Sequence, residues 1–159
     1  MYIILAIVLY IIRLLEAKIK SESDFKNGVV YGVVLHEQGV ISIRFSGPLF
    51  FGDALDVTRF LQKLKSEPKI IIIRMGFVPM VDVSGANALV EFIGRVKKKN
   101  DTKIILSNVK KQPRRMLHEA FLQNNLTWHN IAIATNFENA LKITRRYLKM
   151  KSHSLKQAA

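Results

Sequence analysis

The feature of this 159-residue chain that most limits its possible folds is a run of four consecutive isoleucines, Ile70 to Ile73, within the segment Lys69–Met75. Successive residues of a strand point to opposite faces of a sheet, so an unbroken apolar run presents apolar side chains to both faces. Both faces must then be covered, as they are in sheets flanked by helices. The run therefore predicts a central strand of an α/β fold.

Four further apolar and β-branched runs predict strands on either side of the isoleucines. They are Gly28–Leu35, Val40–Phe45, Ile104–Leu106 and, as a short edge strand, Ile131–Ala134. Only four residues, His36 to Gly39, separate the first two runs, and a connection of that length indicates a hairpin.

Helical periodicity or end signals mark four segments between and after the strands. Helices are expected over Asp53–Ser66, over Ser84–Asn100, from Pro113 to about Asn124, and from a Thr135/Glu138 capping box to about Lys149. Residues 150–159 are expected to form a polar tail. The alternation of strands and helices predicts one α/β domain over residues 28–149, with a mixed sheet of four or five strands flanked by about four helices.

The N-terminal residues 1–19 do not fit this soluble pattern. Met1 to Ile12 is almost wholly apolar, but twelve helical residues reach only about 18 Å, short of the roughly 30 Å hydrocarbon core of a bilayer. We expect a membrane-associated helix: the end of a membrane-spanning helix, or a segment that docks at the interface or on the domain. Basic residues follow it, so the linker 20–27 and the domain are expected on the cytoplasmic side.

The chain is strongly basic, with 25 Lys and Arg against 12 Asp and Glu and a net charge of +13. Such an excess implies contact with an anionic membrane surface, nucleic acid or an acidic protein. Nucleic acid is the least expected of these, because Arg95 to Arg115 contains no aromatic residue that could stack on bases. The candidate contacts with an anionic surface are Lys97, Lys98, Lys99, Lys110, Lys111, Arg114 and Arg115.

No pattern in the sequence indicates catalysis or a bound metal. The chain has no cysteine, and its four histidines are not spaced as metal ligands. Phosphate-binding glycine loops and the Gly-x-Ser-x-Gly elbow are also missing from the sequence. We expect neither an enzyme nor a resident cofactor.

The loops Ser46–Asp53 and Gly76–Gly85 follow two predicted strands and are expected at the same end of the sheet, where α/β folds bind ligands and partners. Ser84 stands where a helix begins. It could cap the helix, which is worth about 1 kcal/mol, or be phosphorylated, since a helix N-terminus tolerates a phosphate. The residues proposed for binding are Gly47, Pro48, Phe50, Phe51, Gly52, Asp53, Pro79, Asp82, Ser84 and Gly85.

The turn Asp82-Val83-Ser84-Gly85, between a buried strand and an apolar-faced helix, resembles the STAS domain. STAS domains occur in bacterial anti-sigma-factor antagonists and at the cytoplasmic C-terminus of sulfate permeases of the SulP/SLC26 family. The antagonists usually have Asp-Ser-Ser-Gly, with the serine matching Ser84 phosphorylated by a kinase, and Val83 departs from that pattern. The segment Gly47–Ala54 (GPLFFGDA) is more similar to the transporter branch.

This resemblance, which covers about Gly28 to Tyr147, implies a regulatory or interaction domain of a SulP-type anion transporter. Its implied partners are the membrane domain of the permease, the inner leaflet and a regulatory protein, and it could form a homodimer. Nucleotide binding could also follow from the resemblance. Two alternatives stay open at this point: a free-standing phosphorylation switch that depends on Ser84, and a basic nucleic-acid-binding protein.

Overall fold

The computed structural model describes residues 18–19, 30–49, 67–126 and 131–158. Three of the expected features lie outside the described residues: most of the apolar N-terminal segment, the linker and the helix over Asp53–Ser66. In the part of the chain that the structure describes, six strands form one sheet in sequence order. They are β1 (Lys18–Ile19), β2 (Val30–Leu35), β3 (Val40–Ser46), β4 (Ile70–Phe77), β5 (Lys103–Ser107) and β6 (Ile131–Ala134).

The sheet is mixed, as the sequence predicts. β1, β2 and β3 pair antiparallel, whereas β3, β4, β5 and β6 pair parallel. The expected hairpin joins β2 to β3 through a short 3₁₀ turn, η1 (Glu37–Gly39), in which Gln38 and Gly39 have positive φ. β6 is the edge strand that the sequence indicates, and the two-residue β1 adds a strand at the opposite edge.

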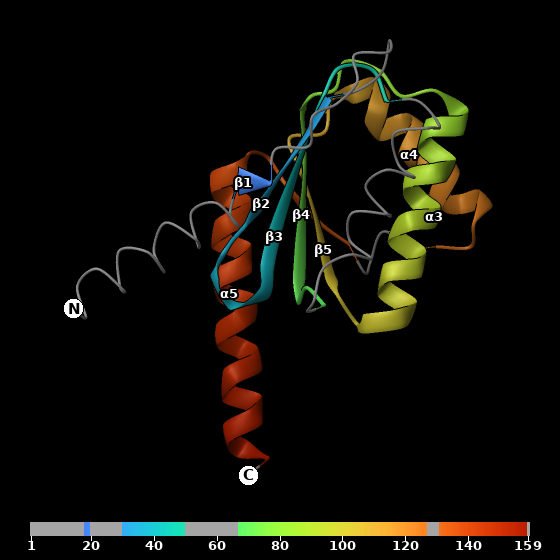
Figure 1. Ribbon diagram of the computed structural model, residues 1–159. Helices are drawn as coiled ribbons and strands as arrows, with labels where there is room; N and C mark the ends of the chain where they lie inside the picture. The colour runs from blue at the N-terminus through green and yellow to red at the C-terminus, as the bar shows by residue number, and fades with distance from the viewer. Residues whose placement is uncertain (1–17, 20–29, 50–66, 127–130, 159) are drawn as a thin grey trace.

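Within the described ranges, three α-helices cover the two faces of the sheet, with α3 (Val83–Asn100) and α4 (Lys111–Gln123) on one side and α5 (Phe137–Gln157) on the other (Figure 1). The isoleucine run of β4 requires cover on both faces of the sheet, and all four of its side chains are completely buried. Ile71 and Ile73 belong to the core that includes α3 and α4, while Ile70 and Ile72 pack in the core under α5. β4 is thus a central strand covered on both faces.

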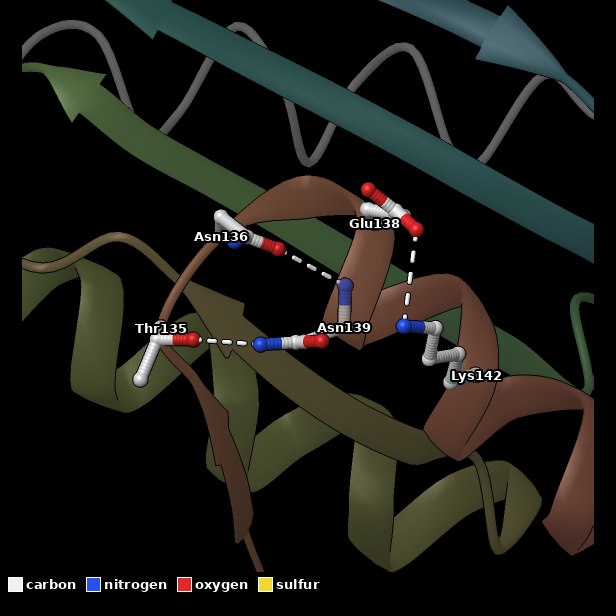
Figure 2. Close-up of polar contacts among 5 residues, drawn as sticks. All are labelled: Thr135, Asn136, Glu138, Asn139 and Lys142. Carbon is white, nitrogen blue, oxygen red and sulfur yellow. Dashed lines mark hydrogen bonds and ion pairs between the residues drawn. The ribbon is translucent and has the colours of Figure 1, made fainter.

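The start of α5 differs by one residue from the predicted capping box (Figure 2). The cap is Asn136, whose side-chain oxygen accepts a hydrogen bond from the Asn139 backbone N–H at 2.8 Å. Thr135 instead accepts from the Asn139 side-chain amide at 2.5 Å. Glu138 does not reach back to a cap but pairs with Lys142 at 3.4 Å on the helix surface. Asparagine is at least as good an N-cap as threonine, so the helix begins after the nearer and stronger cap.

The end of α5 lies well beyond the predicted boundary near Lys149. The helix continues to Gln157, and Figure 1 shows its last turns extending past the strands. No glycine or proline stands between Met150 and Gln157 to stop it. The hydroxyls of Ser152 and Ser154 donate to carbonyl oxygens three residues earlier, at 2.8 and 2.9 Å. The expected tail is therefore polar and exposed, but helical as far as it is described.

Candidate partner-binding site

The loops that follow β3 and β4 lie side by side at the carboxyl end of the sheet, as the sequence predicts. Backbone hydrogen bonds join them: the N–H of Gly47 donates to the carbonyl of Phe77 at 2.9 Å, and that of Leu49 to Met80 at 3.1 Å. The N–H of Asp82 donates in turn to the carbonyl of Leu49 at 3.4 Å. The two loops therefore continue the pairing of β3 with β4 beyond the strands themselves.

A glutamine of α4 holds the second loop from its other side. The side-chain oxygen of Gln112 accepts from the N–H of Val81 at 2.9 Å, and its amide nitrogen donates to the carbonyl of Val81 at 2.9 Å. Val81 also forms a parallel bridge with Leu49. The Gln112 amide thus takes the place of a neighbouring strand for one residue. Sequence reasoning missed Gln112, since it lies 31 residues from Val81.

The first turn of α3 is capped by Asp82 and not by Ser84. The Asp82 carboxylate accepts a hydrogen bond from the N–H of Gly85 at 2.5 Å, and α3 begins at Val83. The prediction of Ser84 as the cap is therefore wrong. Aspartate is as good a cap as serine. The hydrogen bond from the Asp82 N–H to the Leu49 carbonyl also holds Asp82 in the extended conformation of an N-cap. Ser84 is left as an exposed residue of the first helical turn.

Glycine is required at position 85 because the backbone of the β3 loop lies directly against it. A Cβ atom at this position would lie 2.3 Å from the backbone oxygen of Leu49 and 2.9 Å from Oδ1 of Asp82. Only a residue without a side chain lets the N-terminus of α3 pack directly on the β3 loop. Gly85 is therefore a structural part of the site rather than a contact residue.

Apolar side chains of the second loop are exposed on this frame. Phe77 is 63% exposed, Val83 60% and Met80 45%. We call the exposed residues Phe77, Pro79, Met80, Val83 and Ser84 the loop surface. Two other residues of the same segment, Val78 and Val81, are fully buried, so the frame beneath is packed. An exposed apolar surface on a rigid support is typical of a protein contact site.

The first loop is described only as far as Leu49. Gly47 has a φ of +105°, a conformation that favours glycine. Pro48 is half-buried, and Leu49 is fully buried. The remaining predicted residues, Phe50, Phe51, Gly52 and Asp53, lie outside the described residues.

The predicted basic contacts fall into two groups. Lys97 and Lys98 lie in the last turns of α3, which leads to the start of β5. The other group follows the end of β5 and begins α4, so the two groups stand at opposite ends of the sheet. That group comprises Lys110, Lys111, Arg114 and Arg115. The side chain of Lys99 lies outside the described part of the chain.

Burial, followed by the positive charge of Lys103, lowers the pKa of Lys97, with the charge of Asp101 opposing the shift. Three residues of the second group lie together at a cavity of about 480 Å³, which His118 and the β6 residue Ile133 complete. Its lining cations are Lys111, Arg114 and Arg115. The structure thus places three of the predicted basic contacts together on α4.

Within the described ranges, no three His, Asp or Glu side chains are grouped so that they could hold a metal ion. The helices of those same ranges include none with the length and apolar character needed to cross a membrane.

The family model of the STAS domain matches residues 32–140, more than half of the chain. The chain belongs to the STAS domain family. This assignment confirms the resemblance seen in the two loops, and the matched residues include every strand from β3 to β6 and both loops of the site.

This chain is similar in sequence to one part of a longer protein. It is 28% identical over 146 residues to the "Putative sulfate transporter YvdB" of Bacillus subtilis, covering 89% of this chain and 25% of that protein. The chain therefore spans a quarter of the length of the curated relative that it matches.

Solved structures share the fold. The STAS domain of a SulP transporter from Vibrio cholerae has a TM-score of 0.61 at 23% identity, covering 74% of this chain and 89% of that one. A sulfate transporter family protein from Wolinella succinogenes has a TM-score of 0.61 at 27% identity, covering 72% and 92%. An anti-sigma factor antagonist from Mycobacterium paratuberculosis, at 16% identity and a TM-score of 0.55 over 75% and 96%, is similar in fold alone.

Proposed function

We propose that this STAS domain is the regulatory and interaction domain of a SulP-type transporter of sulfate or another inorganic anion. The observation that carries the proposal is the match to the Bacillus subtilis relative, which extends over 89% of this chain but only 25% of that protein. A domain that corresponds to one quarter of a transporter is expected to act by binding rather than by catalysis. Its proposed partner is the membrane domain, and its proposed place is the cytoplasmic side of the membrane.

The loop surface is the proposed contact with that partner. Its exposed apolar side chains, Phe77, Met80 and Val83, would be covered in a complex. The frame beneath them is held by backbone hydrogen bonds and by Gln112, so little conformational entropy is lost when a partner binds. The cations of α4 are proposed to face the anionic inner leaflet, where each exposed Lys or Arg adds about 1 kcal/mol of attraction.

The first test concerns the gene. The DNA upstream of the codon for Met1 is expected to encode a series of apolar helices, in the same frame or in an adjacent one. A region without such a coding sequence would count strongly against the proposal. Where the coding sequence is present, its product is the membrane domain to be used as the binding probe.

The second test concerns the loop surface. The tagged 159-residue chain is co-expressed with that membrane domain and recovered from detergent extracts. Val83→Asp and Met80→Asp are expected to reduce co-purification at least tenfold, because an exposed charge replaces apolar contact area without disturbing the core. Leu122→Asp is the matched control, since Leu122 is 64% exposed on α4. Equal losses from all three variants, or no association of the unaltered chain, would contradict the proposal.

A second candidate function, a phosphorylation switch, is favoured by one observation. Asp82 caps α3, so the Ser84 hydroxyl is exposed and not needed for the cap. A phosphate there would be attracted by the helix N-terminus and repelled by the Asp82 carboxylate. Incubation with anti-sigma-type kinases and ATP, followed by mass spectrometry, tests this function, with Ser84→Ala as the control. An unmodified Ser84 under conditions that phosphorylate a known antagonist would exclude it.

A further inference from the structure

Two arginines stand next to each other on the face of the sheet that α5 covers. Arg44 of β3 and Arg74 of β4 are register partners, which puts their Cα atoms about 4.8 Å apart, as in any pair of adjacent strands. The preceding residues, Ile43 and Ile73, are buried in the core on the opposite face. Because side chains alternate along a strand, both arginines point to the α5 face.

Nothing that the structure describes compensates these two charges. Neither guanidinium forms an ion pair or hydrogen bond with a described residue, and the ion pairs Glu91–Arg95 and Glu138–Lys142 lie elsewhere, on α3 and α5. Burial, and after it the charge of Arg44, lowers the pKa of Arg74. Arg44 is exposed and Arg74 is half-buried, so water screens part of the repulsion between the two like charges, and the remainder lowers stability.

Aromatic rings hold the two guanidiniums without neutralising them. The Arg74 guanidinium carbon lies 4.0 Å from the centre of the Phe137 ring, at the start of α5. That of Arg44 lies 6.0 Å from the centre of the Phe77 ring, which belongs to the loop surface. Cation–π contacts of this kind restrict the orientation of an arginine but leave its charge and its N–H donors available.

A buried hydroxyl extends the same row onto the next strand. Ser107 of β5 is the register partner of Arg74 and is 1% exposed. Its Oγ is the buried side-chain polar atom that lacks a hydrogen-bond partner among the described residues. An unsatisfied buried hydroxyl is uncommon and costs free energy. Because it is covered, a ligand would reach it only after the side chains above it shift, so the two arginines carry the inference.

We propose that Arg44 and Arg74 bind a tetrahedral oxyanion with two negative charges, of the inorganic phosphate or phosphate monoester class. Guanidinium groups bind such oxyanions through paired N–H donors. A dianion would neutralise both arginines, whereas a carboxylate would leave one charge uncompensated. The ligand is a small soluble ion rather than a lipid headgroup, since Arg74 is partly buried against Phe137.

The experiment measures the thermal stability and phosphate affinity of the full 159-residue chain. Sodium phosphate is titrated against sodium chloride of equal ionic strength, by circular dichroism and calorimetry. Phosphate is expected to raise Tm beyond the chloride control. Arg44→Gln is expected to weaken phosphate binding about 10- to 100-fold, as loss of a hydrogen bond to a charged group does. Without phosphate, Arg44→Gln is expected to have a Tm no lower than that of the unaltered chain, because repulsion is removed.

The matched control is Arg145→Gln, since Arg145 is exposed on α5 and distant in sequence from the pair. It is expected to respond to phosphate like the unaltered chain. An equal loss of response in both variants would indicate a general charge effect and would overturn the proposal, as would the absence of any phosphate-specific shift. Phosphatidylcholine vesicles with and without phosphatidic acid distinguish the source. Binding to phosphatidic acid that needs Arg44, without a response to soluble phosphate, would overturn the assignment to a soluble ion.

Discussion

Replacement of Gly85 by alanine is the sharpest test of how the site is built. The added Cβ would lie 2.3 Å from the carbonyl oxygen of Leu49 and 3.0 Å from its carbonyl carbon. These are backbone atoms of a loop held by its own hydrogen bonds to Met80 and Asp82, so no side-chain rotation can relieve the contact. The start of α3 must therefore move away from the β3 loop.

The size of the effect follows from two contributions. Forcing an extra carbon into a packed site costs about 1–3 kcal/mol. Moving Gly85 also weakens the cap hydrogen bond from its N–H to Asp82, which is worth about 1 kcal/mol. A total of about 3 kcal/mol lowers Tm by about 6–12 °C in a domain of this size. Urea and thermal unfolding, followed by circular dichroism, measure both quantities.

Two other glycines are internal controls for this prediction. A Cβ at Gly32 would meet nothing within 4 Å, so Gly32→Ala is expected to leave stability unchanged or to raise it slightly. A Cβ at Gly76 would lie 2.6 Å from the side-chain nitrogen of Asn108, which can rotate away, so Gly76→Ala is expected to have an intermediate effect. A Gly85→Ala protein as stable as Gly32→Ala would refute the packing of α3 on the β3 loop.

Four further predictions concern single side chains. Asp82→Ala is expected to cost about 1 kcal/mol and Ser84→Ala less than about 0.5 kcal/mol, because Asp82 is the cap; equal costs in urea unfolding would contradict this assignment. Gln112→Ala is expected to cost about 1–3 kcal/mol, since it leaves the N–H and carbonyl of Val81 without these partners, and an unchanged unfolding midpoint would show that water replaces them. Ser107→Ala is expected to be neutral or stabilising in phosphate-free buffer, because the buried hydroxyl lacks a described partner; a clear loss of Tm would show that it has one. Burial, followed by the charge of Arg74, lowers the pKa of His36 below its ordinary value of 6.5. As pH drops through about 6.5 the unfolded chain therefore binds a proton at His36 more readily than the folded chain, and stability falls. His36→Gln is expected to reduce this fall in Tm, and a pH profile of Tm identical to that of the unaltered chain would contradict the shift.

Patterns that depend on neighbouring residues were readable from the chain itself. The isoleucine run at Ile70–Ile73 predicts a central strand because it places apolar side chains on both faces of the sheet, and these are buried only when both faces are covered. The hairpin between β2 and β3, the edge position of β6 and the meeting of the two loops follow from run length, connection length and the rule that parallel strands share their carboxyl ends. The same local patterns, in Gly47–Ala54 and Asp82–Gly85, carry the resemblance to the STAS family that the comparisons confirm.

Exact boundaries were less predictable, since neighbouring residues compete for one role. Asp82 and Ser84 are both good helix caps, as are Thr135 and Asn136, and sequence alone chose the wrong one in each pair. The choice depends on tertiary contacts. The hydrogen bond from the Asp82 N–H to the Leu49 carbonyl fixes Asp82 in the position from which it caps α3. The end of α5 was missed for a different reason, because polar composition after Met150 does not stop a helix that lacks a glycine or proline.

The contacts between distant segments were decided by the tertiary structure alone. Gln112 meets Val81, and Arg44 lies next to Arg74, only because the strand order and register bring segments about 30 residues apart into contact. The basic residues between Lys97 and Arg115 look like one group in the sequence. Because β5 runs from one end of the sheet to the other, it separates them into two groups at opposite ends. Sequence spacing encodes which face of an element a residue occupies, whereas register and crossover direction determine which other residue lies opposite it.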